Sequence, residues 1–138
     1  HSNIESRSDN PSVLLLPLDP DKSASDIRGE IQKQTGIKVG VVVNDSSGRA
    51  WRNGIIGIAI GASGVEVLSD LRGEADLFGN TLEATEVGRA DELASAASLL
   101  MGQGNEGLPV VVIKGIAESK DINNAKSLIR KASEDLFR

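Results

Sequence analysis

An acid, two hydroxyls and two arginines follow an apolar run in the segment VVVNDSSGRAWRNG, residues 41–54. Asp45 and Ser46 offer adjacent oxygen ligands, which suit a hard divalent cation such as Mg²⁺, Mn²⁺ or Ca²⁺. Arg49 and Arg52 have the paired N–H donors that grip a phosphate or a carboxylate. Asn, Asp, Ser and Gly are also ordinary turn residues. The segment is therefore interpreted in two ways, as a plain hairpin or loop and as a binding site.

The composition narrows the chemistry that such a site could perform. The 138-residue chain has no cysteine, and its single histidine is the first residue, His1. Disulfides, thiolate sites and Ser-His or Cys-His catalysis therefore have no partners within it. The formal net charge of -5 argues against broad binding to nucleic acid, which requires clustered Lys and Arg. No apolar run approaches the length of a membrane span, and we expect a cytoplasmic protein.

A second candidate site is the glycine-rich sequence GQGNEG, residues 102–107. Its letters match the dinucleotide fingerprint, but that motif leaves a strand and opens a helix, whereas here a helix is expected before it and a strand after it. A glycine-rich helix end is the local interpretation. A loop whose free N–H groups form an anion-binding nest, with Gln103 and Asn105 as polar arms, is the functional one.

Two further polar groups favour structural roles. The segment SDLRGEADLFG, residues 69–79, contains Asp70, Arg72, Glu74 and Asp76, and a solvated turn with local ion pairs is favoured over a site. Asp91 and Glu92 are neighbours on a predicted helix and point apart, so they make a weak acid/base pair. Trp51 is expected to be a core or hinge anchor.

The elements that would position these residues form an α+β fold with a mixed β-sheet and packed helices. Apolar runs predict strands at residues 12–17, 37–43 and 110–115, and glycine-rich residues 54–64 predict an irregular strand that something approaches closely. Residues 65–80 are short strand and turn material. Residues 18–36 are expected to form a loop and then a helix that is capped by Ser23 or Ser25 and ended by Gly36, and further helices are expected at residues 85–101 and 121–138. The predicted order is β-α-β-β-β-α-β-α in one domain, residues 1–138.

Taken together, these segments resemble the coenzyme F420-0:γ-glutamyl ligase family. The resemblance is carried by VVVNDSSGRAWRNGIIGIAIGASG, LSDLRGEADLFGNTL, ADELASAASLLMGQ and LPVVVIKG, in this order, with IRKASEDLFR at the end. It covers nearly the whole chain, from about Asn3 onward. It implies a partial ligase fold that lacks its N-terminal region, and it implies a homodimer.

The resemblance implies a GTP-dependent ligase that joins L-glutamate to coenzyme F420-0. The γ-phosphoryl group of GTP would pass to the acceptor carboxylate, and the glutamate amine would attack the resulting acyl phosphate, with Mn²⁺ or Mg²⁺ neutralising the triphosphate. The partners are small molecules, with no nucleic acid and no membrane.

The resemblance also assigns roles to residues of this chain. It implies metal ligation by Asp45, Ser46 (where the family usually has Thr) and Gln103. It implies nucleotide binding by Asn3 and by the loop that comprises Met101, Gly102, Gln103, Gly104, Asn105, Glu106, Gly107 and Leu108. Arg49, Arg52 and Arg72 are candidates for gripping substrate carboxylates.

Two departures from the family pattern limit these expectations. One metal-binding Asp would precede His1, and the family's N-terminal nucleotide-contacting region is absent from this chain. We therefore expect the chain to be the carboxyl-terminal portion of such a ligase and to be inactive alone. The alternative is a non-catalytic nucleotide- or metal-binding paralogue, or an interaction domain that kept the scaffold.

Overall fold

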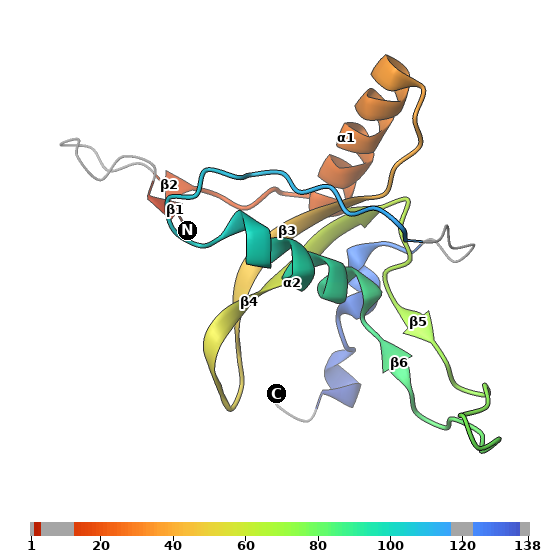
Figure 1. Cartoon of the computed structure of the whole chain (residues 1–138). Coiled ribbons are helices and arrows are strands. Elements are labelled where there is room, and N and C mark those ends of the chain that lie inside the picture. Colours follow the sequence, from red (N-terminus) through yellow and green to blue (C-terminus); the bar gives the residue numbers. More distant parts are fainter. Residues whose placement is uncertain (1, 4–12, 117–122, 136–138) are drawn as a thin grey trace.

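The computed structural model describes residues 2–3, 13–116 and 123–135, and its centre is a long antiparallel hairpin. The hairpin consists of β3 (Val41–Arg49) and β4 (Arg52–Ser63), and the helices α1 (Pro20–Thr35) and α2 (Arg89–Met101) pack against it (Figure 1). The expected α+β class is confirmed, with antiparallel two-stranded sheets throughout the described residues.

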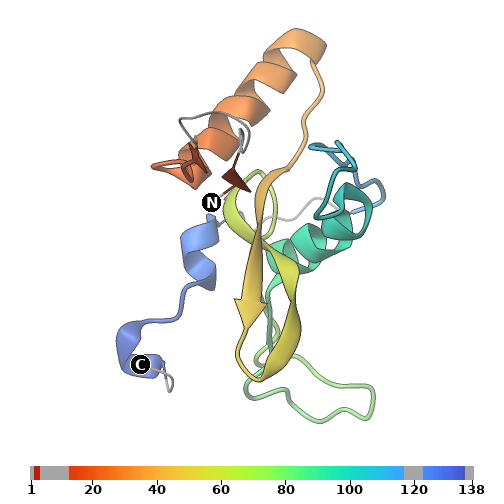
Figure 2. The same ribbon diagram turned by 90° about the vertical axis from the view of Figure 1, so that its left-hand side faces the viewer.

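The remaining elements are short. They are β1 (Ser2–Asn3) with β2 (Val13–Leu14), β5 (Ser69–Asp70) with β6 (Glu86–Val87), and the 3-10 turns η1 (Ala125–Leu128) and η2 (Ala132–Glu134). In the side view the hairpin separates α2 from the two 3-10 turns (Figure 2). No helix among the described residues is both long enough and apolar enough to span a membrane.

The polar segment after the three valines belongs to strand β3. The ladder pairs Asn44 with Ala59 and continues to Arg49 opposite Arg52, with register shifts after Val43 and after Gly48. Our prediction that the strand ends at residue 43 is therefore wrong, because partners on β4 hold these weak strand formers in an extended conformation. The hairpin interpretation is confirmed for the turn itself.

Trp51 lies in the turn between the two strands, with φ of 63° and 90% of its surface exposed. A positive φ is uncommon for a bulky residue and is found mainly where the chain must turn sharply. The expectation that Trp51 is a core residue is wrong.

The start of α1 differs from the prediction and its end agrees with it. Asp19 caps the helix by accepting a hydrogen bond from the Lys22 amide at 3.0 Å, and Pro20 is the first helical residue. This Asp-Pro pair is a stronger start signal than the predicted caps, Ser23 or Ser25, because proline presets the helical φ and has no N–H to satisfy. Gly36 ends the helix with φ of 74°, as predicted.

Helix α2 runs along the free edge of β4 and satisfies its backbone groups. The Ala59 amide donates to Asp91 Oδ1 at 2.8 Å, and the Ser95 hydroxyl donates to the Gly57 carbonyl at 2.7 Å. Four residues of a helix rise about 6 Å, close to the ~6.7 Å spanned by two residues of a strand, so the two spacings match. Asp91 thus has a structural partner on β4, which agrees with the prediction that an acid/base role for Asp91 and Glu92 is weak.

Helix α1 holds β4 in a comparable way through Asp21. One carboxylate oxygen of Asp21 accepts from the amide of Ala62 at 2.9 Å and from the amide of Ala125 at 2.8 Å. These bonds join the first turn of α1 to β4 and to η1, over 41 and 104 residues of sequence. The close approach that the glycines of β4 predicted is also present, since a Cβ on Gly61 would overlap Pro20.

The core is made of small side chains. Its buried members share short or β-branched side chains and are Ala59, Ala62, Val67, Ala90, Ala94 and Ala125, with Val42, Val65 and Leu128 packed against them. Small residues allow α2 and the hairpin to approach closely, as the small face of the predicted helix implied. They also bury little apolar area, which is the main source of folding free energy.

Much apolar surface therefore remains exposed. The chain exposes 10877 Å², against about 6,900 Å² expected for a compact protein of this mass. The exposed side chains include Leu14, Leu15, Leu16, Leu18, Leu108, Val110, Val112, Ile113 and Ile116.

Three element predictions fail in these exposed parts. Of the described part of the strand expected at 12–17, residues 13–17, only Val13–Leu14 is formed, and residues 110–115 have no ladder partner among the described residues. An apolar run becomes a strand only when a neighbouring strand satisfies its backbone. The helix expected at 121–138 is replaced, in its described part, by η1 and η2.

Candidate functional site

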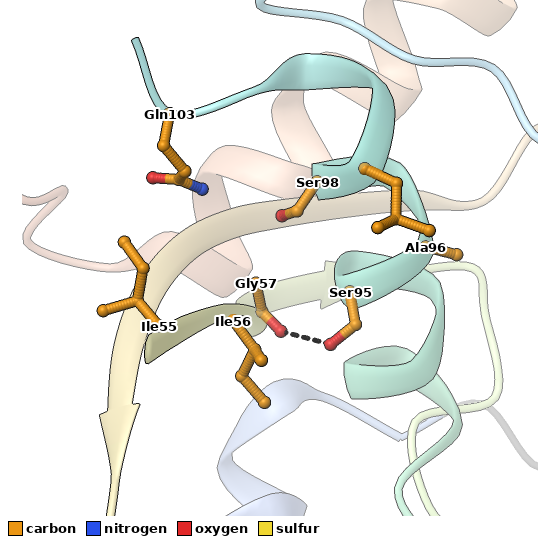
Figure 3. Close-up of a pocket in the computed structure, with 8 residues that line it drawn as sticks. Ile55, Ile56, Gly57, Ser95, Ala96, Ser98 and Gln103 are labelled. Carbon is orange, nitrogen blue, oxygen red and sulfur yellow. Dashed lines mark hydrogen bonds between the residues drawn. The ribbon is translucent and has the colours of Figure 1, made fainter. Parts of the chain in front are cut away.

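A cavity of about 330 Å³ lies between β4 and the second half of α2. It is lined by residues of both elements and by the loop after the helix, and the lining residues are Ile55, Ile56, Gly57, Ser95, Ala96, Ser98, Leu99 and Gln103. In Figure 3 the side chains of Gln103 and Ser98 point toward the same open space. The cavity is uncharged and mainly apolar, and its polar side chains carry one carboxamide and two hydroxyls.

Asn44 connects the hairpin to the helix behind this cavity. Its Nδ2 lies 3.1 Å from the Ala94 carbonyl, 2.9 Å from Ser98 Oγ and 3.5 Å from Met101 Sδ. Residue 44 thereby contacts the last two turns of α2, immediately before the Gln103 loop. The sequence analysis did not select Asn44, because its partners lie 50 to 57 residues away.

Ser95 and Ser98 were likewise not selected as site residues from the sequence. A signal was present, since Asp91, Ser95 and Ser98 follow one another at helical spacing within an otherwise small, apolar face. Polar residues at such positions on a packing face indicate hydrogen bonds to a neighbouring element.

Asp45 and Ser46 lie within β3 rather than after its end. Asp45 is paired with Ile58, and its Oδ1 accepts from the Ser46 amide at 2.8 Å. Successive side chains of a strand point to opposite faces. Since Asn44 faces α2, Asp45 points away from α2 and from the cavity that Gln103 lines.

The predicted metal ligands are thus not gathered at one point. Asp45 and Gln103 are on different sides of the hairpin, and no hydrogen bond between them is recorded. Among the described residues no three acidic or histidine side chains form a group that could hold a metal ion. The predicted set contains only one such side chain, and the role of Asp45, Ser46 and Gln103 as metal ligands stays a prediction.

The glycine-rich loop begins as a helix end. Gly102 follows α2 with φ of 71°, and its N–H donates to the Ser98 carbonyl at 3.0 Å. The amide of Gly104 donates to Glu106 Oε2 at 2.8 Å, so one N–H of the expected nest already contacts an anion from its own loop. A side chain at residue 102 would overlap the Glu106 carboxylate.

The contacts of the other predicted loop residues do not test whether these residues bind a nucleotide. Asn105, Gly107 and Leu108 are exposed, and Met101 is half-buried against Asn44. The backbone of Asn3 pairs with Val13 in the short β1–β2 ladder. Nucleotide binding by these residues stays a prediction.

The three candidate arginines lie on two different hairpins. Arg49 and Arg52 are paired across the end of the β3–β4 ladder, and both are exposed. Arg72, beside β5, forms ion pairs with Asp70 and Glu86, and its side chain lowers the pKa of Asp70 to about 2. The favoured interpretation of this segment as a charged turn with local ion pairs is confirmed.

Comparison with known protein families places these features in context. Residues 1–115 match the family model described as F420-0:Gamma-glutamyl ligase. A protein of Methanococcus maripaludis (strain S2) named coenzyme F420:L-glutamate ligase is 51% identical over 138 residues, which are 100% of this chain and 56% of that protein.

Other organisms have relatives with the same name. The one in Methanocaldococcus jannaschii is 51% identical over 126 residues, covering 91% of this chain and 51% of that protein. The one in Archaeoglobus fulgidus is 44% identical over 127 residues, covering 92% of this chain and 51% of that protein. The chain spans about half the length of these curated relatives, and it belongs to the F420-0:gamma-glutamyl ligase family.

Proposed function

We propose that this chain forms part of a ligase that joins L-glutamate to coenzyme F420-0. The observation that carries the proposal is the 51% identity over the whole chain to a protein named coenzyme F420:L-glutamate ligase. The matched region includes the hairpin, α2 and the Gln103 loop, which are the parts that form the cavity. Fold alone would not support the proposal, because one fold serves many functions.

The proposed reaction uses GTP, as its Mn²⁺ or Mg²⁺ complex, to activate the acceptor carboxylate. The γ-phosphoryl group passes to that carboxylate and GDP leaves. The glutamate amine then forms the amide bond and releases phosphate. In reactions of this kind the protein contributes mainly positioning and charge stabilisation. Gln103 is the described residue best placed for this role, since its carboxamide lies in the cavity.

A chimeric enzyme tests the proposal. The matching 56% of the Methanococcus maripaludis (strain S2) protein would be replaced by this chain. We expect the chimera to add glutamate to coenzyme F420-0 only when GTP is present, with the product followed by mass spectrometry. We expect the 138-residue chain alone to form no product. A folded chimera that forms none would contradict the proposal, and a chimera that binds GTP without ligation would favour the non-catalytic alternative.

The proposed metal ligand Asp45 is tested separately. Calorimetry with GTP and Mn²⁺ would compare the chain with Asp45→Asn, and Asp26→Asn would serve as control because Asp26 is exposed on α1 and pairs with Lys22. Loss of a metal ligand is expected to weaken binding by about tenfold or more, whereas the control binds as the original chain does. Equal binding by all three proteins would show that Asp45 is not a ligand.

A further inference from the structure

The orientation of the Asn44 amide is fixed by its neighbours. The Ala94 carbonyl 3.1 Å away can only accept a hydrogen bond, so the amino group and not the carbonyl oxygen of Asn44 must face it. Asn44 Oδ1 is buried and has no hydrogen-bond donor. It lies against Gly57, where a Cβ would be 2.8 Å from it.

This orientation determines what the Ser98 hydroxyl can do. Asn44 Nδ2 donates to Ser98 Oγ at 2.9 Å, so that oxygen is used as an acceptor. A hydroxyl has one proton of its own to donate. For Ser98 no acceptor of that proton is recorded among the described residues, and the hydroxyl lies on the cavity wall (Figure 3).

Ser95, one turn earlier on α2, shows the opposite arrangement. Its hydroxyl also reaches the cavity wall, but it donates to the Gly57 carbonyl at 2.7 Å (Figure 3). The proton of Ser95 therefore serves the structure, whereas the proton of Ser98 is available to a ligand.

We propose that Ser98 donates a hydrogen bond to a substrate oxygen bound in the cavity beside Gln103, and that Asn44 is the positioning residue that turns the Ser98 hydroxyl toward it. The inference rests on the proposed function for the identity of the substrates. These supply two sources of the required acceptor, the phosphate oxygens of GTP and the carboxylate oxygens of L-glutamate. A hydroxyl donor next to a carboxamide suits either.

The first experiment titrates the chain with Mg²⁺–GTP and, separately, with L-glutamate, and follows amide chemical shifts by NMR. Ser98→Ala is expected to weaken the binding of one of the two by about three- to tenfold, the effect of one hydrogen bond. Ser25→Ala, at an exposed position of α1 that does not line the cavity, is the control and is expected to change affinity less than about twofold. Thermal unfolding of each variant confirms that it is folded at the titration temperature.

The second experiment separates positioning from general stabilisation by a double-mutant cycle. Asn44→Ala is expected to weaken the binding of the same ligand to the original chain. It is expected to have no further effect on affinity once Ser98→Ala is present. If Asn44 only stabilised the fold, Asn44→Ala would weaken binding equally in the original chain and in the Ser98→Ala chain. Asn44→Asp keeps the shape of the side chain but replaces the amide with a carboxylate. The carboxylate accepts the Ser98 proton and withdraws it from the ligand.

The outcomes distinguish this inference from the proposed function. Ligation by the chimera, together with unchanged affinities in Ser98→Ala, overturns the inference alone. An inactive chimera overturns the proposed function, whatever the titrations give. If the chain alone binds neither Mg²⁺–GTP nor L-glutamate, the same titrations are made with the folded chimera, and unchanged affinities in its Ser98→Ala variant overturn the role of Ser98.

Discussion

Asp21 joins three parts of the fold through one carboxylate oxygen, and its removal is the sharpest test of how the fold is held together. Asp21→Ala deletes the acceptor for the amides of Ala62 and Ala125, at 2.9 and 2.8 Å. Both amides are part-buried and would lose their partner without gaining full access to water. The cost therefore includes the desolvation of two unpaired N–H groups.

The expected magnitude follows from the two bonds. A hydrogen bond to a charged group contributes about 1.5–3 kcal/mol. Because this site is only part-buried, we take the lower end and expect Asp21→Ala to lower the free energy of unfolding by about 3 kcal/mol. Asp21→Asn keeps an oxygen acceptor of the same shape and is expected to cost about 1 kcal/mol.

Urea unfolding followed by far-UV circular dichroism measures these changes, with the slope of the transition checked for constancy. Asp26→Ala is the control, since Asp26 lies on the same helix but is 64% exposed and bonds only to Lys22. We expect no measurable change in the control. The reasoning is refuted if Asp21→Ala is as stable as Asp26→Ala, or if the Ala62 and Ala125 amides keep their protection from hydrogen exchange.

Three further predictions concern other contacts. Gly57→Ala places a methyl group against α2 and should lower the free energy of unfolding by about 2 kcal/mol, whereas Gly48→Ala, which meets no atom within 4 Å, should change it little in the same urea assay. Asp19→Ala removes the cap of α1 and should cost about 1 kcal/mol, and a helical signal that melts at the original urea concentration would contradict this. Arg72 lowers the pKa of Asp70 to about 2, below its ordinary 3.8. Their pair therefore stabilises the fold above about pH 4 and loses this effect as the pH falls toward 2. Asp70→Asn should accordingly lower the unfolding temperature near pH 6 but not near pH 2.

The sequence predicted those elements whose signals are local. The apolar spacing on α2, the glycine that ends α1 and the glycines of β4 each act within a few residues, and all three are present in the structure. Residues 110–115 have an equally clear strand pattern, but a strand also needs a partner. No strand pairs with residues 110–115 among the described residues. No local feature of the sequence indicates that this segment lacks a partner.

The sequence predicts those residues of the candidate site that can be recognised within a single segment. Gln103 was selected from its loop, and the structure places it on the cavity wall. Asn44 and Ser98 were not, since their contact joins residues 54 positions apart and neither has an unusual neighbour. The direction of Asp45 follows from strand alternation, but only once residue 45 is known to lie inside a strand.

The position of Trp51 has a consequence for how this protein can be studied by optical spectroscopy. It is the single tryptophan of the chain, there is no tyrosine, and its indole is 90% exposed at the tip of the hairpin. Its emission should already resemble that of a tryptophan in water, so fluorescence would report almost nothing of the loss of the core. The same indole is an isolated reporter of its own surroundings, and a blue shift on adding another polypeptide would show that the hairpin tip had become covered.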